Sequence, residues 1–290
     1  MATSLSESGL REDGRRPHEV RRVECKLCVF PHADGSAEFR LGATHVIATV
    51  FGPRQASTKA ARVNEDGATI TCRVQSCEFS QSDHRQANKF RRRDRLLGDL
   101  IAQTFQCAVM TNLYAKSSID ICIEILTNDG DINSAAINAA CLALINAGIC
   151  MKDYVVACSA GFIAKSTRSL KQTNKTGAKT DHIMFSGLQG IVDLNQQEKN
   201  LSKHSSYSST NISEGNESGL EMCNGIVTVA MMPNSGEIVT LEMQSVLPLS
   251  QMEKLLSFAK KGINSIHTQM AAAVKKHSFM LLERKGFIGS

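Results

Sequence analysis

Alternating apolar and polar residues in the first half of the chain predict a β-sheet. The clearest strand covers residues 118–127, where every second residue is an isoleucine and the residues between are mostly polar. Side chains that alternate in this way lie on opposite faces of a strand, so one face is expected to be buried. Less regular runs predict further strands at residues 20–30, 37–51 and 68–79, with an Asp34-Gly35 turn after the first of them.

Helical spacing of apolar residues follows in two places. Residues 92–110 carry leucine, isoleucine and phenylalanine at intervals of three and four, and the chain closes with a longer stretch of the same kind after Pro248. Ser250 and Glu253 have the spacing of a capping box, which predicts where this last helix begins. Between them, residues 134–149 are small and apolar and predict a buried helix.

These elements together predict an α+β fold. The run from strand 118–127 through helix 134–149 to strand 153–164 is one βαβ-like unit in a pattern that is otherwise antiparallel. A further strand is expected at residues 187–195, and a hairpin at 226–232 and 237–243. Two polar insertions, at about 165–181 and 196–222, are too poor in apolar residues to fold alone.

Composition excludes several classes of protein. The 290 residues are 42% hydrophobic and 21% charged, which excludes disorder of the whole chain and a coiled coil. No run of eighteen apolar residues occurs, so no membrane span is expected, and the N-terminus has no apolar segment typical of a secretory signal. Cys25 and Cys28 form a single CxxC pair. A zinc site needs about four ligands, so no metal site is predicted.

Positive charge is concentrated in one place. The net charge is only +5, but residues 83–95 hold six Lys or Arg against two Asp. Arginines at the start of the predicted helix oppose its dipole, which indicates an anionic partner at this end. A polyanion is the natural partner of such a cluster, and the alternative is a solvated basic helix end.

Three motifs carry a family resemblance. They are RxDGRRPxExR at residues 11–21, DGSAEFRLGATHVIATVFGP at 34–53 and INAGICMKDYVVACSAGF at 145–162. With the arginine-rich helix start, they resemble RNase PH-type proteins, and within these the exosome ring subunit that corresponds to the catalytic subunit of the archaeal ring. The resemblance runs from about residue 9 to about residue 282, interrupted by the two polar insertions.

The resemblance implies a fold, an assembly and a location. It implies one RNase PH-type domain with a βαβ core like that of ribosomal protein S5 and a long C-terminal helix. It also implies a hetero-oligomeric ring of RNase PH-type exosome subunits around a channel for single-stranded RNA, with cap subunits of the S1/KH type and hydrolytic nucleases as further partners and no membrane. The expected locations are the nucleus, nucleolus and cytoplasm, and the expected processes include rRNA processing.

The resemblance also implies which residues act. In active members inorganic phosphate attacks the RNA 3′ end and releases nucleoside diphosphates. Arginines hold the RNA, and Arg92 and Arg93 match the paired arginines of the family, with Arg91 and Arg95 beside them. Bidentate contacts between guanidinium groups and phosphates suit this position.

The phosphate site of the family is predicted to be lost. Active members carry a Gly-Ser/Thr-Arg step after the isoleucine-rich strand, and this chain has Asp131, Ile132 and Asn133 there. A carboxylate repels phosphate by a few kcal/mol at an effective dielectric constant of about 20. Ser134 supplies a hydroxyl only if the register shifts by two residues.

The acidic pair of the family is half lost. Asp193 matches the first aspartate and is the remaining catalytic candidate, but Lys199 stands at the second position, six residues on. Glu198 is a substitute if the backbone shifts, and Glu214 and Glu217 are remote alternatives. Asp193 as an ordinary aspartate at a strand end is an equal interpretation.

Three functions therefore compete. The first is a non-catalytic ring and RNA-channel subunit of the exosome, which needs no cofactor. The second is an active 3′-to-5′ exoribonuclease that uses Mg²⁺ and inorganic phosphate. The third is a free-standing RNA-binding protein that uses the arginine cluster, and it predicts a monomer with weak, salt-sensitive binding.

Overall fold

The computed structural model of the chain describes residues 9–55, 67–80, 87–167, 184–199, 225–243 and 247–286. Within these ranges the side chains of residues 87–91, 163–167 and 184–188 are not described. The predicted polar insertions fall largely on residues 168–183 and 200–224, which lie outside the described residues. The division of the chain into one domain with two insertions therefore stays a prediction.

The first half of the chain forms a five-stranded sheet. Its order is β1 (Val23–Leu27), β2 (Gly35–Leu41), β3 (Thr44–Gln55), β5 (Ser117–Thr127) and β4 (Thr69–Ser76). The isoleucines of β5 are buried while Asp120, Cys122 and Glu124 lie on the open face, which confirms the predicted alternation. The run predicted as one strand at residues 37–51 is two strands, because Gly42 turns the chain at φ +60°.

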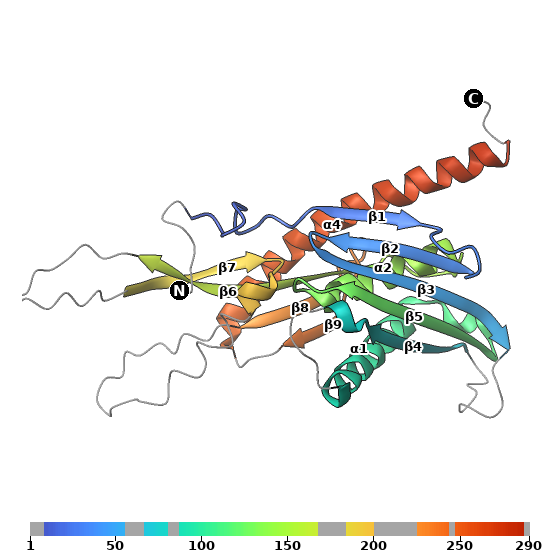
Figure 1. The fold of residues 1–290 in the computed structure, drawn as a ribbon, viewed down its shortest axis with the longest axis horizontal. Coiled ribbons are helices and arrows are strands. Elements are labelled where there is room, and N and C mark those ends of the chain that lie inside the picture. The colour runs from blue at the N-terminus through green and yellow to red at the C-terminus, as the bar shows by residue number, and fades with distance from the viewer. Residues whose placement is uncertain are drawn as a thin grey trace, which may run out of the picture.

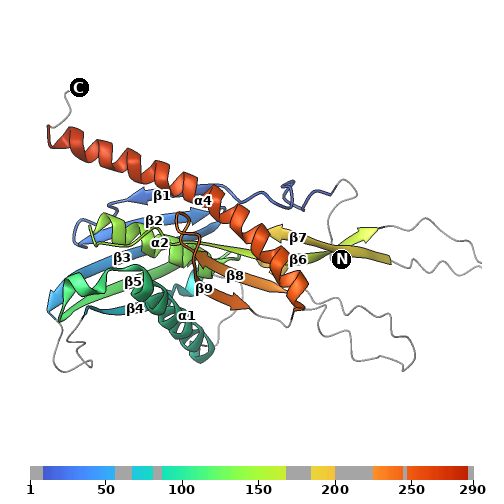
Figure 2. The same cartoon turned by 180° about the vertical axis from the view of Figure 1, so that it is seen from behind.

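The second half forms a four-stranded antiparallel sheet in the order β7 (Met184–Val192), β6 (Val156–Thr167), β8 (Ile226–Met231) and β9 (Ile238–Met243). Figures 1 and 2 show the two sheets end to end along the long axis of the molecule. The predicted hairpin is confirmed as β8 and β9.

Helix α2 (Ile132–Asn146) connects the sheets and is buried on nearly every side. Asn138 pairs with the backbone of β6, donating to the Ala157 carbonyl and accepting from the Ala157 N–H. The predicted βαβ-like unit is wrong in one respect, because β5 and β6 belong to different sheets. The parallel crossover is instead β4–α1–β5, which a single-sequence pattern does not reveal.

Helix α1 (Ala87–Ala108) packs on β4, with Gly98 at the closest approach. A Cβ at Gly98 would lie 2.8 Å from the carbonyl oxygen of Cys72. The helix begins five residues before the predicted start, so Arg92 and Arg93 lie in its second turn. The argument from the helix dipole therefore fails, since that effect falls off beyond the first turn. Two short 3₁₀ helices, Glu78–Ser80 and Thr111–Tyr114, flank β4 and α1.

Helix α4 (Leu249–Arg284) packs its first half on the second sheet and on β1. Its N-cap is Pro248 without a side-chain hydrogen bond, so the predicted capping box at Ser250 and Glu253 is wrong. Within the described ranges, no helix has the length and apolar character needed to cross a bilayer.

Two turns that carry candidate residues pack against each other. Gly130, between β5 and α2, has φ +93°, and a Cβ there would lie 2.5 Å from the Leu194 carbonyl oxygen and 2.7 Å from the Gln196 nitrogen. Only glycine fits both the conformation and the contact. This contact places the start of α2 beside the turn after β7.

We therefore expect Gly130→Ala to lower the free energy of unfolding by about 2–4 kcal/mol, through backbone strain and overpacking. The matched control is Gly236→Ala, which has φ +74° but no atom within 4 Å of the added Cβ, and should cost about 1 kcal/mol. Urea unfolding followed by circular dichroism measures both. Equal losses in the two variants would show that the contact between the turns is not tight.

Candidate functional site

The candidate residues meet where four segments converge: the N-terminal residues 9–22, the start of α2, the turn after β7 and the second turn of α1. Asp131 and Asp193 are both fully buried here. Lys199 lies beside Asp131, and the positive charge of Arg93 contributes to lowering the pKa of Lys199. The structure thus brings together residues from the three predicted parts of the site.

Asp193 is held by two arginines from the N-terminal segment. Its Oδ1 accepts hydrogen bonds from Nε and Nη2 of Arg21, at 3.1 and 2.7 Å. Its Oδ2 accepts from Nε and the backbone N–H of Arg21 and from Nη1 of Arg15, at 2.9, 2.8 and 3.2 Å. Burial raises the pKa of Asp193, but the hydrogen bonds and charge of Arg21, with Arg15, hold it below its ordinary value.

A second buried ion pair fixes the same turn. Arg11 donates from Nε to Oε1 of Glu198 at 2.8 Å, and it also donates to the carbonyls of Val192 and Asp193 at 2.6 Å each. Glu198 accepts in turn from the backbone N–H of Asn195 at 2.8 Å. Glu198 therefore holds the turn in place and is not available as the substitute carboxylate that the sequence left open.

Asp131 occupies the N-cap of α2 in a left-handed conformation, with φ +53°. Its side chain makes no cap hydrogen bond and turns toward β6, where Oδ2 accepts from the backbone N–H of Ser159 at 3.3 Å. Oδ1 lies 3.9 Å from Nζ of Lys199 and has no hydrogen-bond partner among the described residues. A carboxylate thus faces Lys199 at the end of the helix where an anion would otherwise bind.

The three residues after Asp131 are buried or hydrogen-bonded to other parts of the chain. Ile132 is buried, and Asn133 donates from its side chain to Glu242 on β9. Ser134 is buried, and its hydroxyl donates to the carbonyl of Asp131 at 3.1 Å. The alternative register, in which Ser134 supplies a hydroxyl to phosphate, does not fit this geometry.

Lys199, which the resemblance aligns with the second aspartate of the family, brings a positive charge beside Asp131. Burial lowers its pKa, the carboxylate of Asp131 raises it, and the nearby charges of Arg93 and Arg21 lower it. The net direction is downward from the ordinary value of a lysine. The site therefore sets one ammonium against one carboxylate rather than two carboxylates side by side.

The arginine cluster lies on the second turn of α1, and Arg93 is near enough to Lys199 for its charge to lower the pKa of Lys199. Arg92, Arg93 and Arg95 are exposed, while the side chain of Arg91 is not described. Asp94 points back to the sheet, where its carboxylate accepts from the hydroxyl of Ser76 at 2.9 Å and from the Ser76 N–H at 3.2 Å. This anchor fixes the helix turn from which the arginines project. Their role in RNA binding stays a prediction.

The residues present do not suit a divalent metal ion. Both oxygens of Asp193 are occupied by arginines, and the second acidic position holds a lysine ammonium. In the described part of the chain, no three His, Cys, Asp or Glu side chains are grouped as metal ligands. Mg²⁺ is usually held by one or two carboxylates together with water and substrate phosphates, and Asp193, enclosed by Arg21 and Arg15, leaves no oxygen free for it.

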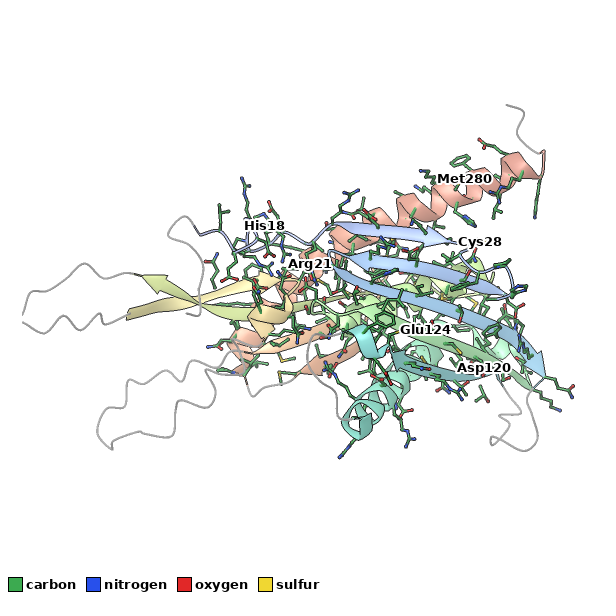
Figure 3. All side chains as sticks on the ribbon, in the orientation of Figure 1. His18, Arg21, Cys28, Asp120, Glu124 and Met280 are labelled. Carbon is green, nitrogen blue, oxygen red and sulfur yellow. The ribbon has the colours of Figure 1, made fainter. Side chains whose placement is uncertain are left out.

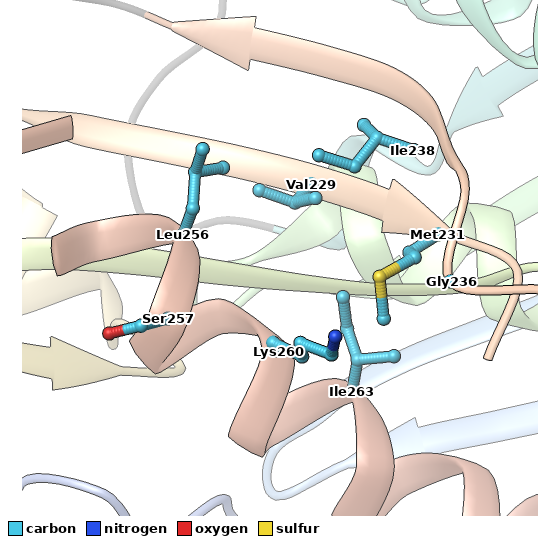
Figure 4. A pocket seen from close by; sticks show the side chains of 8 residues that line it. All are labelled: Val229, Met231, Gly236, Ile238, Leu256, Ser257, Lys260 and Ile263. Carbon is cyan, nitrogen blue, oxygen red and sulfur yellow. The ribbon is translucent and has the colours of Figure 1, made fainter. Parts of the chain in front are cut away.

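A separate groove of about 190 Å³ lies between β8, β9 and the start of α4. Figure 4 shows that its lining is mostly aliphatic, with Ile238, Leu256 and Ile263 around it and Lys260 at the side. It contains no pair of groups for acid–base or nucleophilic chemistry. The groove is therefore not a candidate active site.

Sequence reasoning assigned no chemistry to Arg11, Arg15 and Arg21, although all three lie in the first quoted motif. Their partners at Asp193 and Glu198 are more than 170 residues away in the sequence, although Arg15 also pairs with Asp13 and Arg21 with Asp129. Figure 3 shows Arg21 where the N-terminal segment meets the strands. The sequence did offer one indication: the segment is too short to fold by itself and carries three arginines.

We expect Asp193→Asn to lower the free energy of unfolding by about 3–5 kcal/mol at neutral pH, because it leaves the buried charge of Arg21 without its partner. The pKa of Asp193 is lowered in the folded state. The ion pair therefore stabilises the fold above the unfolded pKa of about 3.9, and the contribution is lost as the pH falls toward the folded pKa.

The measurement is urea unfolding from pH 7 down to pH 3 for the wild type, Asp193→Asn and a control at the exposed Asp99. The wild type and Asp99→Asn should lose stability below about pH 4. Asp193→Asn should have a lower free energy of unfolding at pH 7 and should lose less of it on acidification. If the wild type and Asp193→Asn lost the same amount of stability on acidification, the role of this ion pair would be contradicted.

Comparison with known proteins places these features in one family. Residues 19–150 match the family model described as "3' exoribonuclease family, domain 1" (RNase PH). The chain is 31% identical over 274 residues to human exosome complex component RRP41, covering 94% of each chain. It is 32% identical over 281 residues to the Arabidopsis thaliana RRP41 homolog, covering 97% of this chain and 98% of the relative.

An archaeal relative and a solved structure agree with this. Exosome complex component Rrp41 of Methanopyrus kandleri is 29% identical over 272 residues, covering 94% of this chain and 95% of the relative. The crystal structure of rice Rrp46 superposes with a TM-score of 0.64 at 19% identity, covering 90% of this chain and 98% of that one. This supports the predicted RNase PH-like fold with its long C-terminal helix. The chain belongs to the RNase PH family and is similar over most of its length to RRP41-type components of the exosome complex.

Proposed function

We propose that this chain is a non-catalytic core subunit of the exosome, which contributes to 3′-to-5′ RNA processing and degradation by forming the ring and its RNA channel. The observation that carries the proposal is the buried Asp131 at the N-cap of α2, facing Lys199 at 3.9 Å. By the resemblance, Asp131 aligns with the start of the step that binds the attacking phosphate in phosphorolytic members of the family, and Lys199 aligns with their second aspartate.

Electrostatics argue against phosphate binding at this position. A phosphate at about 4 Å from Asp131 would be repelled by about 4 kcal/mol per unit charge at an effective dielectric constant of about 20. Lys199 offsets part of that repulsion, but its charge is already balanced by Asp131. The start of α2 also offers Ile132 and Asn133 in place of a hydroxyl and a guanidinium.

The acidic chemistry is equally unsupported. Asp193 is 0% exposed and accepts five hydrogen bonds from arginine groups, so neither oxygen can reach a metal ion or a leaving group. Its pKa is held low, which disfavours the protonated form that a general acid needs. Asp193 is a structural ion-pair partner in this proposal, and it is not a catalytic residue.

The RNA path is proposed to remain. Arg92, Arg93 and Arg95 are exposed beside the altered site and suit phosphate contacts. The proposal includes ring formation with other RNase PH-type exosome subunits, contact with cap subunits of the S1/KH type, and hydrolysis by associated nucleases. It also places the chain in the nucleus, nucleolus and cytoplasm, with no cofactor of its own.

The test of lost catalysis is a phosphorolysis assay. The chain is incubated with single-stranded RNA and Mg²⁺, alone and with its ring partners but without hydrolytic nucleases, with and without inorganic phosphate. We expect no phosphate-dependent release of nucleoside diphosphates, while a phosphorolytic RNase PH-type enzyme run in parallel releases them. Diphosphates that appear only with phosphate would identify the chain as an active exoribonuclease.

The RNA path has its own test. Replacing Arg92 and Arg93 by Glu should weaken binding of single-stranded RNA to the assembled ring by at least about tenfold, and should flatten its salt dependence by roughly 0.7 per lost phosphate contact. The control reverses two exposed lysines of α4, Lys254 and Lys261, to Glu. An unchanged RNA footprint in the Arg92/Arg93 variant would remove these arginines from the path. A wild-type monomer that binds RNA equally well would favour the free-standing alternative.

A further inference from the structure

The last two turns of α4 project beyond the rest of the protein. The buried residues of this helix end at Met270, and every residue from 278 to 284 is exposed. At 1.5 Å per residue, this segment is about 10 Å long. Figures 1 and 3 show the end of the helix running past β1 and away from the sheet, with Met280 labelled on the projecting part.

The projecting segment is apolar where it would be expected to be polar. Phe279, Met280, Leu281 and Leu282 are consecutive, and they are 58%, 42%, 38% and 39% exposed. Single exposed apolar side chains are common, but a contiguous group marks an interaction site more often than chance placement. Nothing in the fold requires apolar side chains at these positions, because no described element packs around them.

These side chains point to more than one side of the helix. Leu281 continues the stripe of Met270 and Val274 that packs against the core. At about 100° per residue, Phe279 lies roughly 160° around the helix from Leu281. A flat surface such as a bilayer contacts one side of a helix only. A groove contacts opposite sides at once, so the distribution favours a protein groove.

The charges around the apolar residues indicate the chemistry of the surface that would bind them. Lys275, Lys276, Arg284 and Lys285 flank them, against a single acidic residue, Glu283. A second copy of this segment would bring like charges together, which costs free energy. A groove with acidic residues at its rim would instead pair with the flanking lysines and arginine.

We propose that residues 278–284 of α4 dock as a helix into an apolar groove with an acidic rim on another subunit of the exosome. Phe279 and Leu282, three residues apart, are the anchors on one side of the helix, and Leu281 is the anchor on the other. Lys275 and Lys276 contact the rim. This docking surface rests on the membership of the chain in the exosome, and it does not depend on whether the chain is catalytic.

The test is assembly of the full-length chain with the purified remaining subunits of the exosome core, measured by size exclusion and by titration. Phe279→Ser/Leu282→Ser should weaken incorporation at least tenfold while leaving the melting temperature of the isolated chain unchanged. The matched control, Phe79→Ser/Leu113→Ser, removes one Phe and one Leu that are 74% and 63% exposed elsewhere, and should assemble normally.

A second pair of variants tests the charge. Lys275→Glu/Lys276→Glu should weaken incorporation at low salt and much less at high salt, whereas Lys254→Glu/Lys261→Glu at the other end of α4 should not. A photo-crosslinker placed at Met280 should react with a segment of a partner subunit that contains apolar residues flanked by Asp or Glu.

Several results would overturn the proposal. They are normal assembly of Phe279→Ser/Leu282→Ser, a lowered melting temperature of that isolated variant, or self-association of the wild type that this variant abolishes. Binding of the isolated chain to phosphatidylserine vesicles through these residues would replace the protein partner by a membrane. Phosphorolysis by the wild type would overturn the proposed function and leave the docking result standing.

Discussion

The ion pair between Asp193 and Arg21 ties the N-terminal segment to the turn after β7, and the arrangement of the whole site depends on it. Arg21 also donates to the carbonyl of Asp129 at 2.9 Å, so one guanidinium joins the segment before β1, the turn before α2 and the turn after β7. Two charges buried together are stable only when their hydrogen bonds are satisfied. Here they are satisfied by groups that lie far apart in the sequence, and this fixes the positions of Asp131 and Lys199.

That constraint bears on the proposed loss of phosphorolytic activity. In an active RNase PH-type enzyme, as the resemblance implies, a pair of aspartates acts together with a helix N-terminus that binds an anion. The aspartate pair and the helix N-terminus each require space for a ligand. In this chain the first aspartate is enclosed by arginines, and the second position carries Lys199 opposite Asp131. The two substitutions compensate each other in charge, so the site remains stable while its affinity for phosphate and for a divalent cation is expected to fall. The exposed arginines of α1 are not buried against another charge, so they need no compensating substitution.

Much of the fold was predictable because the pattern of apolar residues is local. The alternation in β5, the all-round apolar character of α2 and the stripe of α4 each identified their element. The errors came from effects that the pattern does not contain. Gly42 divides one run into two strands, α1 begins in polar residues before its apolar stripe reaches the sheet, and β5 and β6 enter different sheets. These outcomes are set by packing between elements.

The sequence by itself determined the α+β class and the arginine cluster, and its resemblance to the family predicted the substitutions at residues 131–133 and Lys199 in place of an aspartate. Residue identity is enough for those statements, because the missing hydroxyl, guanidinium and carboxylate are chemical groups. Only the tertiary structure decided that Asp193 is enclosed by Arg21 and Arg15, that Glu198 is paired with Arg11, and that Lys199 faces Asp131. Each of these contacts joins residues separated by tens to nearly two hundred positions, so burial and charge pairing arise only when the chain has folded.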